Sequence, residues 1–118
     1  MADRTAGRKD DQEKIRMELI PPELPFAVGV ILTSGAKKYE DRNWEKGMSW
    51  SRVFGALMRH MWCWWGGLGP TRKNFALGTL DDETGHSHLW HAACCIAFLV
   101  AFEERQMDEF DDRPRPHP

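Results

Sequence analysis

Residues 49–65 read SWSRVFGALMRHMWCWW, and their apolar positions recur at steps of three and four. That period gathers the large apolar side chains on one side of a helix, whereas a strand would need strict alternation. Ser49 and Ser51 are both suitable N-cap residues, and a Gly-Gly pair follows at 66–67. We therefore predict a helix that begins near residue 49 and ends at this pair.

Two further apolar stretches predict helices on either side of this one. The first follows Pro21-Pro22, a helix-start signal, and runs toward Lys38. The other follows the acidic residues 81–83, which suit the positive end of a helix dipole, and runs through Phe102. No segment alternates in the way a strand does. The expected fold class is all-α, a small helical bundle with flexible N- and C-terminal tails.

Length and composition allow one domain. The chain has 118 residues, of which 42% are hydrophobic and 29% are charged, so it can bury a core but not two cores. We expect a flexible arm over residues 1–8, a single domain over 9–104, and an acidic and proline-rich tail over 105–118.

Charge and hydropathy exclude several partners. The formal net charge of −2 is too balanced for a protein that binds nucleic acid through charge excess, so no direct nucleic-acid binding is expected. No stretch reaches the ~18 apolar residues of a membrane span, and the N-terminus has no apolar signal region. Three cysteines without paired spacing are typical of reduced thiols. We expect a cytoplasmic location.

Residues 81–91, DDETGHSHLWH, are the strongest candidate for chemistry. If the helix already includes Glu83, then Glu83, His88 and His91 fall within an arc of roughly 140°. Carboxylate and imidazole groups on that arc can converge on one metal ion. The alternative is that the acids cap the helix and the histidines are satisfied in the core.

Two other clusters add candidates. Arg59-His60 interrupts the apolar run of the helix over 49–65, and antiparallel packing would bring it near the acidic residues; a snorkelling Arg beside a satisfied His is the alternative. The segment 37–44 sets cations, an amide and two aromatic rings close together. Such groups contact phosphates and stack on bases, but a solvated loop with one buried Trp explains them equally well.

Taken in order, these motifs resemble the dATP/dGTP diphosphohydrolase family of phages and bacteria. The resemblance covers about residues 9–102. It rests on Lys14-Ile15-Arg16, Leu19-Ile20-Pro21-Pro22, Gly35-Ala36-Lys37-Lys38-Tyr39, Asn43-Trp44, Gly47, Arg59-His60, Asp81, Glu83-Thr84-Gly85, His88-Leu89 and His91-Ala92. The segment 67–80 is longer than the short link expected at that place.

The resemblance implies a MazG-like fold and metal-dependent hydrolysis of purine deoxynucleoside triphosphates to monophosphate and pyrophosphate. It implies catalytic roles for Glu83, His60 and His88. Metal ligands would be Asp81, Glu83, His88 and His91; Asp81 is favoured over Asp82 for its spacing to Glu83. Nucleotide contacts would be Lys14, Arg16, Lys38, Tyr39, Asn43, Trp44 and Arg59.

Carboxylates suit Mg²⁺, whereas the histidines make Mn²⁺ the alternative cofactor. The rival functions are an HD-type phosphohydrolase, disfavoured because the chain holds no His-Asp dipeptide, and a non-catalytic nucleotide-binding or host-interaction protein. We also expect a homo-oligomer, because three helices and six tryptophans offer more apolar surface than so small a domain covers. In such an oligomer the arm with Lys14 and Arg16 could reach another chain's site.

Overall fold

The computed structural model describes residues 6–10, 12–66 and 80–115. Within these ranges it contains no strand, only an isolated bridge between Leu80 and Ser87, so the all-α class is confirmed. Residues 67–79, which make up nearly all of the link that is longer than expected, lie outside the described residues. In chain order the helices are η1 (Met17–Leu19), α1 (Glu23–Ala36), η2 (Asn43–Lys46), α2 (Trp50–Trp65), α3 (His88–Glu104) and η3 (Asp108–Phe110).

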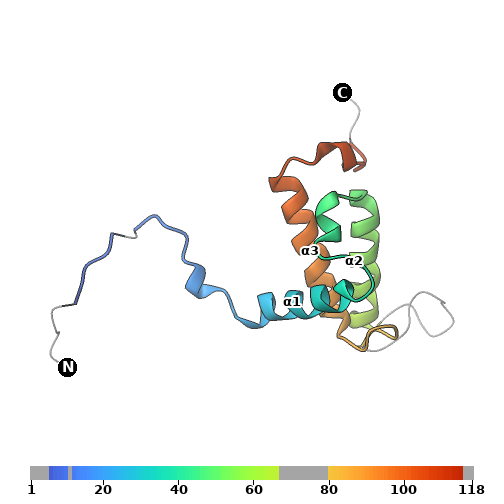
Figure 1. Cartoon of the computed structure of the whole chain (residues 1–118), viewed down its shortest axis with the longest axis horizontal. Helices are drawn as coiled ribbons and strands as arrows, with labels where there is room; N and C mark the ends of the chain where they lie inside the picture. Colours follow the sequence, from blue (N-terminus) through green and yellow to red (C-terminus); the bar gives the residue numbers. More distant parts are fainter. Residues whose placement is uncertain (1–5, 11, 67–79, 116–118) are drawn as a thin grey trace.

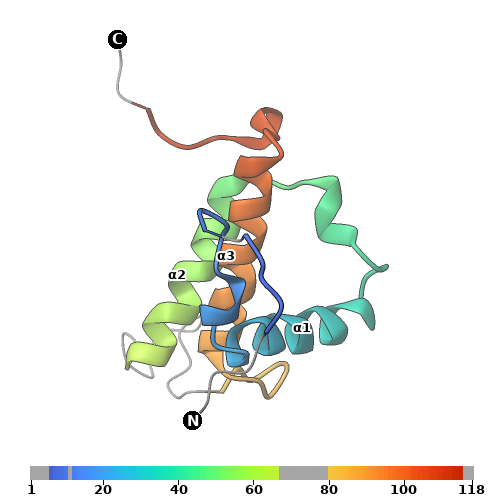
Figure 2. The same cartoon turned by 90° about the vertical axis from the view of Figure 1, so that its left-hand side faces the viewer.

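Helices α2 and α3 pack side by side and run in opposite directions, as Figure 1 shows. Helix α1 crosses α3 near the end where α3 begins, and the Phe26 ring meets the Trp90 ring edge-on there (Figure 2). The end of α2 and the start of α3 therefore lie at the same end of the pair. That arrangement brings Arg59-His60 toward the residues that precede α3.

Helix α2 begins and ends where the sequence predicts. Ser49 is its N-cap residue, but the Asp112 carboxylate satisfies the first turn by accepting hydrogen bonds from the Ser51 N–H (2.8 Å) and the Ser49 hydroxyl (2.7 Å). Gly66 closes the helix at φ +132°, a conformation that suits glycine.

Apolar side chains fill the other end of the pair, where α2 begins and α3 ends. Trp50, Val53 and Phe102 are buried together, and Phe102 is fully buried. The core also includes residues past 104, because Met107 and Phe110 pack against it and a Cβ at Gly47 would collide with the Phe110 ring. The boundary at residue 104 stays a prediction, but this part of the expected tail is packed. The other partly buried members are Trp44, Met48, Cys95, Phe98 and Leu99.

The three cysteines are free thiols, as expected. Burial raises the pKa of Cys94 to about 12 and that of Cys95 to about 11, so both are inert thiols at neutral pH. None of the described helices combines the length and the apolarity that crossing a bilayer requires.

Helix α3 begins after Glu83, whereas the expected metal-binding arc required Glu83 to be part of this helix. Its first residue is His88, because the Ser87 hydroxyl accepts the Leu89 N–H at 3.1 Å and caps the helix there. Glu83 lies outside the helix, so the expected arc of Glu83, His88 and His91 on one helix face is wrong. The residues from Asp81 to His86 instead form a tight turn, with the Asp81 N–H donating to the His86 carbonyl at 2.7 Å.

Candidate metal centre

Three imidazole rings meet where α2 ends and α3 begins. The Nδ1 atoms of His60 on α2 and His88 on α3 lie 2.9 Å apart. The His91 ring, one turn further along α3, stacks on the His60 ring with a centroid distance of 4.6 Å and an angle of 10°. Antiparallel packing thus brings together histidines that lie about 30 residues apart in the sequence.

Asp81 adds a carboxylate to this cluster, and the turn that follows it fixes the carboxylate's position. Its Oδ2 accepts hydrogen bonds from the Thr84 N–H (2.9 Å), the Thr84 hydroxyl (3.1 Å) and the Glu83 N–H (3.1 Å). Burial by itself would raise the pKa of Asp81, but the Thr84 hydrogen bonds, together with His91 and His60, lower it. The carboxylate is therefore ionised at neutral pH.

Thr84 also contacts the histidines. Its hydroxyl lies 2.8 Å from the His91 Nε2, so one side chain holds both His91 and Asp81. Thr84 belongs to the Glu83-Thr84-Gly85 motif, from which no role for its hydroxyl was predicted. The signal was available, because an Asp followed three residues later by Thr is typical of a side chain that hydrogen-bonds its own turn.

The imidazoles of His60 and His91 are neutral at pH 7. Burial and the neighbouring rings of His91 and His88 lower the pKa of His60 to about 4. Burial also lowers the pKa of His91, so its 3.9 Å contact with Asp81 joins a neutral ring to a carboxylate and is not an ion pair. A neutral imidazole has a free lone pair, which is the form that binds metals.

These groups fit a divalent cation. His60, Asp81 and His88 each offer one donor atom, and the three atoms lie within 4.8 Å of one another. The His88 Nε2 is buried and has no hydrogen-bond partner within the described part of the chain, an unusual state for a polar atom. Two imidazoles and one carboxylate favour Mn²⁺ or another nitrogen-binding metal over Mg²⁺, which prefers oxygen ligands.

Of the four expected metal ligands, Asp81 and His88 belong to this donor set, where His60 joins them, whereas Glu83 lies at the rim of the cluster. Its side chain is exposed and its Oε1 is 3.4 Å from the Lys38 Nζ, which raises the pKa of Lys38. An exposed pair at this distance contributes little stability, so either side chain can turn to another partner. The contact brings the end of α1 to the turn before α3. Ser34 and His86, whose Oγ and Nε2 lie 2.9 Å apart, join the same two segments.

The other expected nucleotide contacts divide into two groups. Tyr39 is exposed, with the Lys38 Nζ 5.5 Å from its ring centroid, and Arg59 is exposed on α2 as the residue before His60. Asn43 begins η2, and Trp44 after it stacks on Phe98 at 4.8 Å, in the core at the other end of the pair. The structure therefore brings Trp44 to the packing cluster and not to the histidines.

Lys14 and Arg16 lie on the N-terminal arm. Both are exposed, and the Arg16 guanidinium pairs with Glu18 at 2.9 Å. The arm runs away from the helices (Figure 1), so neither cation reaches the histidine cluster of its own chain in this structure.

Comparison with known proteins gives one family and one curated relative. The family model described as "dATP/dGTP diphosphohydrolase, N-terminal" matches residues 4–113. A protein of Salmonella phage PMBT28 named dATP/dGTP diphosphohydrolase is 34% identical over 93 residues, which cover 79% of this chain. The matched region is 28% of that relative's length. No solved structure matches the chain.

Proposed function

Because this chain belongs to the family described as "dATP/dGTP diphosphohydrolase, N-terminal", we propose that it hydrolyses purine deoxynucleoside triphosphates to the monophosphate and pyrophosphate with the help of a divalent metal ion. The substrate class comes from the names of the family and of the phage relative, whose whole length is much greater than this chain. The chemistry comes from the histidine cluster. A cytoplasmic location and the absence of direct nucleic-acid binding stay predictions.

The single observation that carries this proposal is the convergence of donor atoms from His60, Asp81 and His88 within 4.8 Å. These three residues would hold the ion, with His91 behind His60 and Glu83 able to turn in from the rim. A bound divalent ion neutralises phosphate charge and lowers the pKa of water. The donor set favours Mn²⁺, with Mg²⁺ as the alternative.

The chain's own side chains supply the remaining work of the proposed reaction. Lys38 can exchange Glu83 for a phosphate oxygen, and Arg59, the exposed residue before His60 on α2, is the second proposed cation. His60 and His88 are the proposed catalytic imidazoles. A ring that gives its lone pair to the ion keeps one N–H, which can donate a hydrogen bond to an attacking water and orient it. Glu83 is the proposed catalytic carboxylate because it borders the cluster and remains exposed.

The support for the remaining expected nucleotide contacts differs from one residue to the next. Tyr39, whose ring centroid lies 5.5 Å from the Lys38 Nζ, is a proposed nucleotide contact beside that cation. Asn43 and Trp44 lie on η2, where the Trp44 ring stacks on Phe98, and a contact of either residue with substrate stays a prediction. Lys14 and Arg16 would act only from another chain.

The test is turnover by the purified chain with each deoxynucleoside triphosphate, with Mn²⁺ or Mg²⁺, and with the products resolved by ion-exchange chromatography. We expect purine monophosphate and pyrophosphate in equal amounts. His88→Asn should lower the rate at least about 100-fold, because it removes a metal-binding nitrogen. His86→Asn is the matched control, since His86 bonds Ser34 and lies outside the donor cluster.

Two outcomes would contradict the proposal. Nucleotide binding without any product, in either metal, would favour the non-catalytic alternative. Equal rates for His88→Asn and His86→Asn would show that the histidine cluster does not carry the reaction, whatever the substrate.

A further inference from the structure

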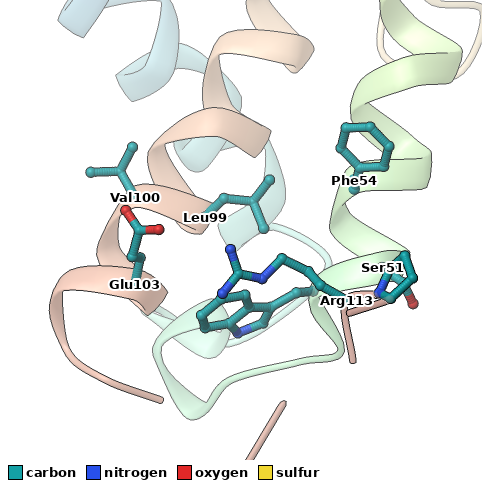
Figure 3. Close-up of a pocket in the computed structure, with 8 residues that line it drawn as sticks. Ser51, Phe54, Leu99, Val100, Glu103 and Arg113 are labelled. Carbon is teal, nitrogen blue, oxygen red and sulfur yellow. The ribbon is translucent and has the colours of Figure 1, made fainter. Parts of the chain in front are cut away.

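Cations at the two ends of the α2–α3 pair are held very differently. At the packing end Arg113 lines a cavity of about 450 Å³, together with Glu103 and apolar side chains of α2 and α3 (Figure 3). Two 2.9 Å hydrogen bonds join the Arg113 guanidinium to the Asp111 carboxylate, and its Cζ lies 4.8 Å from the Trp50 ring centroid. These contacts fix the cation, so its role is in packing.

Lys38, just past the end of α1, is held loosely by comparison. Its Nζ lies 3.4 Å from the Glu83 Oε1, whereas charge-assisted hydrogen bonds are typically about 2.7–2.9 Å long. The side chains of Lys38 and Glu83 are 63% and 76% exposed, so water competes with the contact. Neither side chain is committed to this partner.

The backbone beneath this contact is fixed on both sides. The Glu83 N–H donates to the Asp81 Oδ2 at 3.1 Å, so Glu83 stays beside the donor cluster whichever way its side chain turns. The Lys38 N–H donates to the Gly35 carbonyl at 3.0 Å, and the Lys38 Nζ lies 5.5 Å from the Tyr39 ring centroid. The contact can therefore break and form again while both segments stay in place.

Each of the two side chains suits a stronger partner in the proposed reaction. A carboxylate such as that of Glu83 binds a divalent ion, and the donor atoms of His60, Asp81 and His88 lie next to it. An ammonium such as that of Lys38 binds a phosphate oxygen. A carboxylate that turns to the ion leaves the ammonium free, and an ammonium that turns to a phosphate leaves the carboxylate free.

We propose that the Lys38–Glu83 pair is an exchange contact that couples uptake of the ion to binding of the phosphate. The first of these ligands to bind must break the contact, and the second finds it already broken. Such coupling is reciprocal, so each ligand raises the affinity for the other by the same factor. For an exposed ion pair that factor is about two- to fivefold. That the phosphate belongs to a nucleotide rests on the proposed function.

Calorimetric titration of the metal-free chain with inorganic pyrophosphate tests one half of the exchange. Glu83→Gln frees Lys38 and should raise the affinity for pyrophosphate about threefold. The same substitution in a Lys38→Met chain should have little effect. A general effect of deleting a negative charge would be present in both chains, so the comparison isolates the contact. Equal gains in the two chains, or no gain in either, would overturn the exchange.

Titration with Mn²⁺ alone tests the other half. Lys38→Met frees Glu83 and should raise the affinity for Mn²⁺ about threefold, but it should have no such effect in a Glu83→Gln chain. Lys37→Met removes the neighbouring exposed charge and is the matched control. Both titrations use low ionic strength, because salt screens exposed charges. A Lys38→Met chain that binds Mn²⁺ no more tightly than the Lys37→Met chain would overturn the exchange.

Turnover separates this inference from the proposed function. A chain that shows both changes in affinity but hydrolyses no nucleotide would overturn the proposed function and leave the exchange standing. A chain that hydrolyses nucleotide, but in which the effects of Lys38→Met and Glu83→Gln are independent of each other, would overturn the exchange alone. All the substituted side chains are exposed, so circular dichroism should show the same fold for every variant.

Discussion

The two ends of the α2–α3 pair are built from the same helices but filled with different side chains. At one end Trp50, Val53 and Phe102 close a dry core, and at the other His60 and His88 face each other 2.9 Å apart. Only seven residues, about two helical turns, separate Val53 from His60 on α2. Changes at the first end should therefore act on stability, and changes at the second should act on metal binding and turnover.

The largest expected effect is at the packing end. Phe102→Ala removes a fully buried ring and should lower the free energy of unfolding by about 4 kcal/mol, a large part of the stability of a domain this small. Chemical denaturation followed by circular dichroism measures the change. A loss below about 1 kcal/mol would show that this end does not hold the fold.

Trp44 lies at the packing end but was expected to contact the nucleotide, so its replacement tests which of the two roles it has. Its ring stacks on Phe98, so Trp44→Ala should lower the free energy of unfolding by about 2 kcal/mol, whereas Trp44→Phe should keep most of the stability. Our sequence-based expectation was a nucleotide contact, which would raise KM more than it lowers kcat. A folded Trp44→Ala chain with unchanged KM would assign this residue to packing alone.

Thr84 tests whether the polar end depends on its supporting hydrogen bonds. Thr84→Val keeps the shape of the side chain but removes the hydroxyl that bonds Asp81 and His91, and it should lower kcat about tenfold. Thr84→Ser should retain the rate because it restores the hydroxyl. Equal rates for the Val and Ser variants would remove Thr84 from the site.

The smallest expected effect concerns Asp112, which caps α2 at the packing end. Hydrogen bonds from Ser51 and Ser49 lower the pKa of Asp112 to about 2. A lowered pKa stabilises the fold above the ordinary value near 4, and this contribution is lost as the pH falls from about 4 to about 2. Asp112→Asn should lower Tm by a few degrees at pH 7 and narrow its difference from the wild type at pH 2. A difference in Tm that stays constant with pH would contradict this account.

Sequence patterns predicted the packing end better than the polar end. The three- and four-residue period of residues 49–65 gave the bounds of α2 almost to the residue, because helix period and caps are local. The start of α3 was set by the Ser87 cap and the Asp81 turn, which compete with helix formation at Glu83. Local patterns do not show whether a helix start at Glu83 or one at His88 is the more stable.

Long-range features were the harder part to predict. Motif order singled out His60 and His88, but only antiparallel packing puts their rings in contact. The capping of α2 by Asp112 joins residues more than 60 positions apart, and no periodicity points to it. Trp44 and Phe98 are likewise partners that only the fold brings together.

Calorimetric titration with Mn²⁺ tests the histidine cluster most directly, because it needs neither substrate nor turnover. The wild type and His86→Asn should each bind one ion per chain, and His88→Asn should lose that binding while keeping its circular dichroism spectrum. A wild-type chain that takes up no Mn²⁺, or a His88→Asn chain that binds it as tightly as the wild type, would contradict the assignment of His60, Asp81 and His88 as the metal centre.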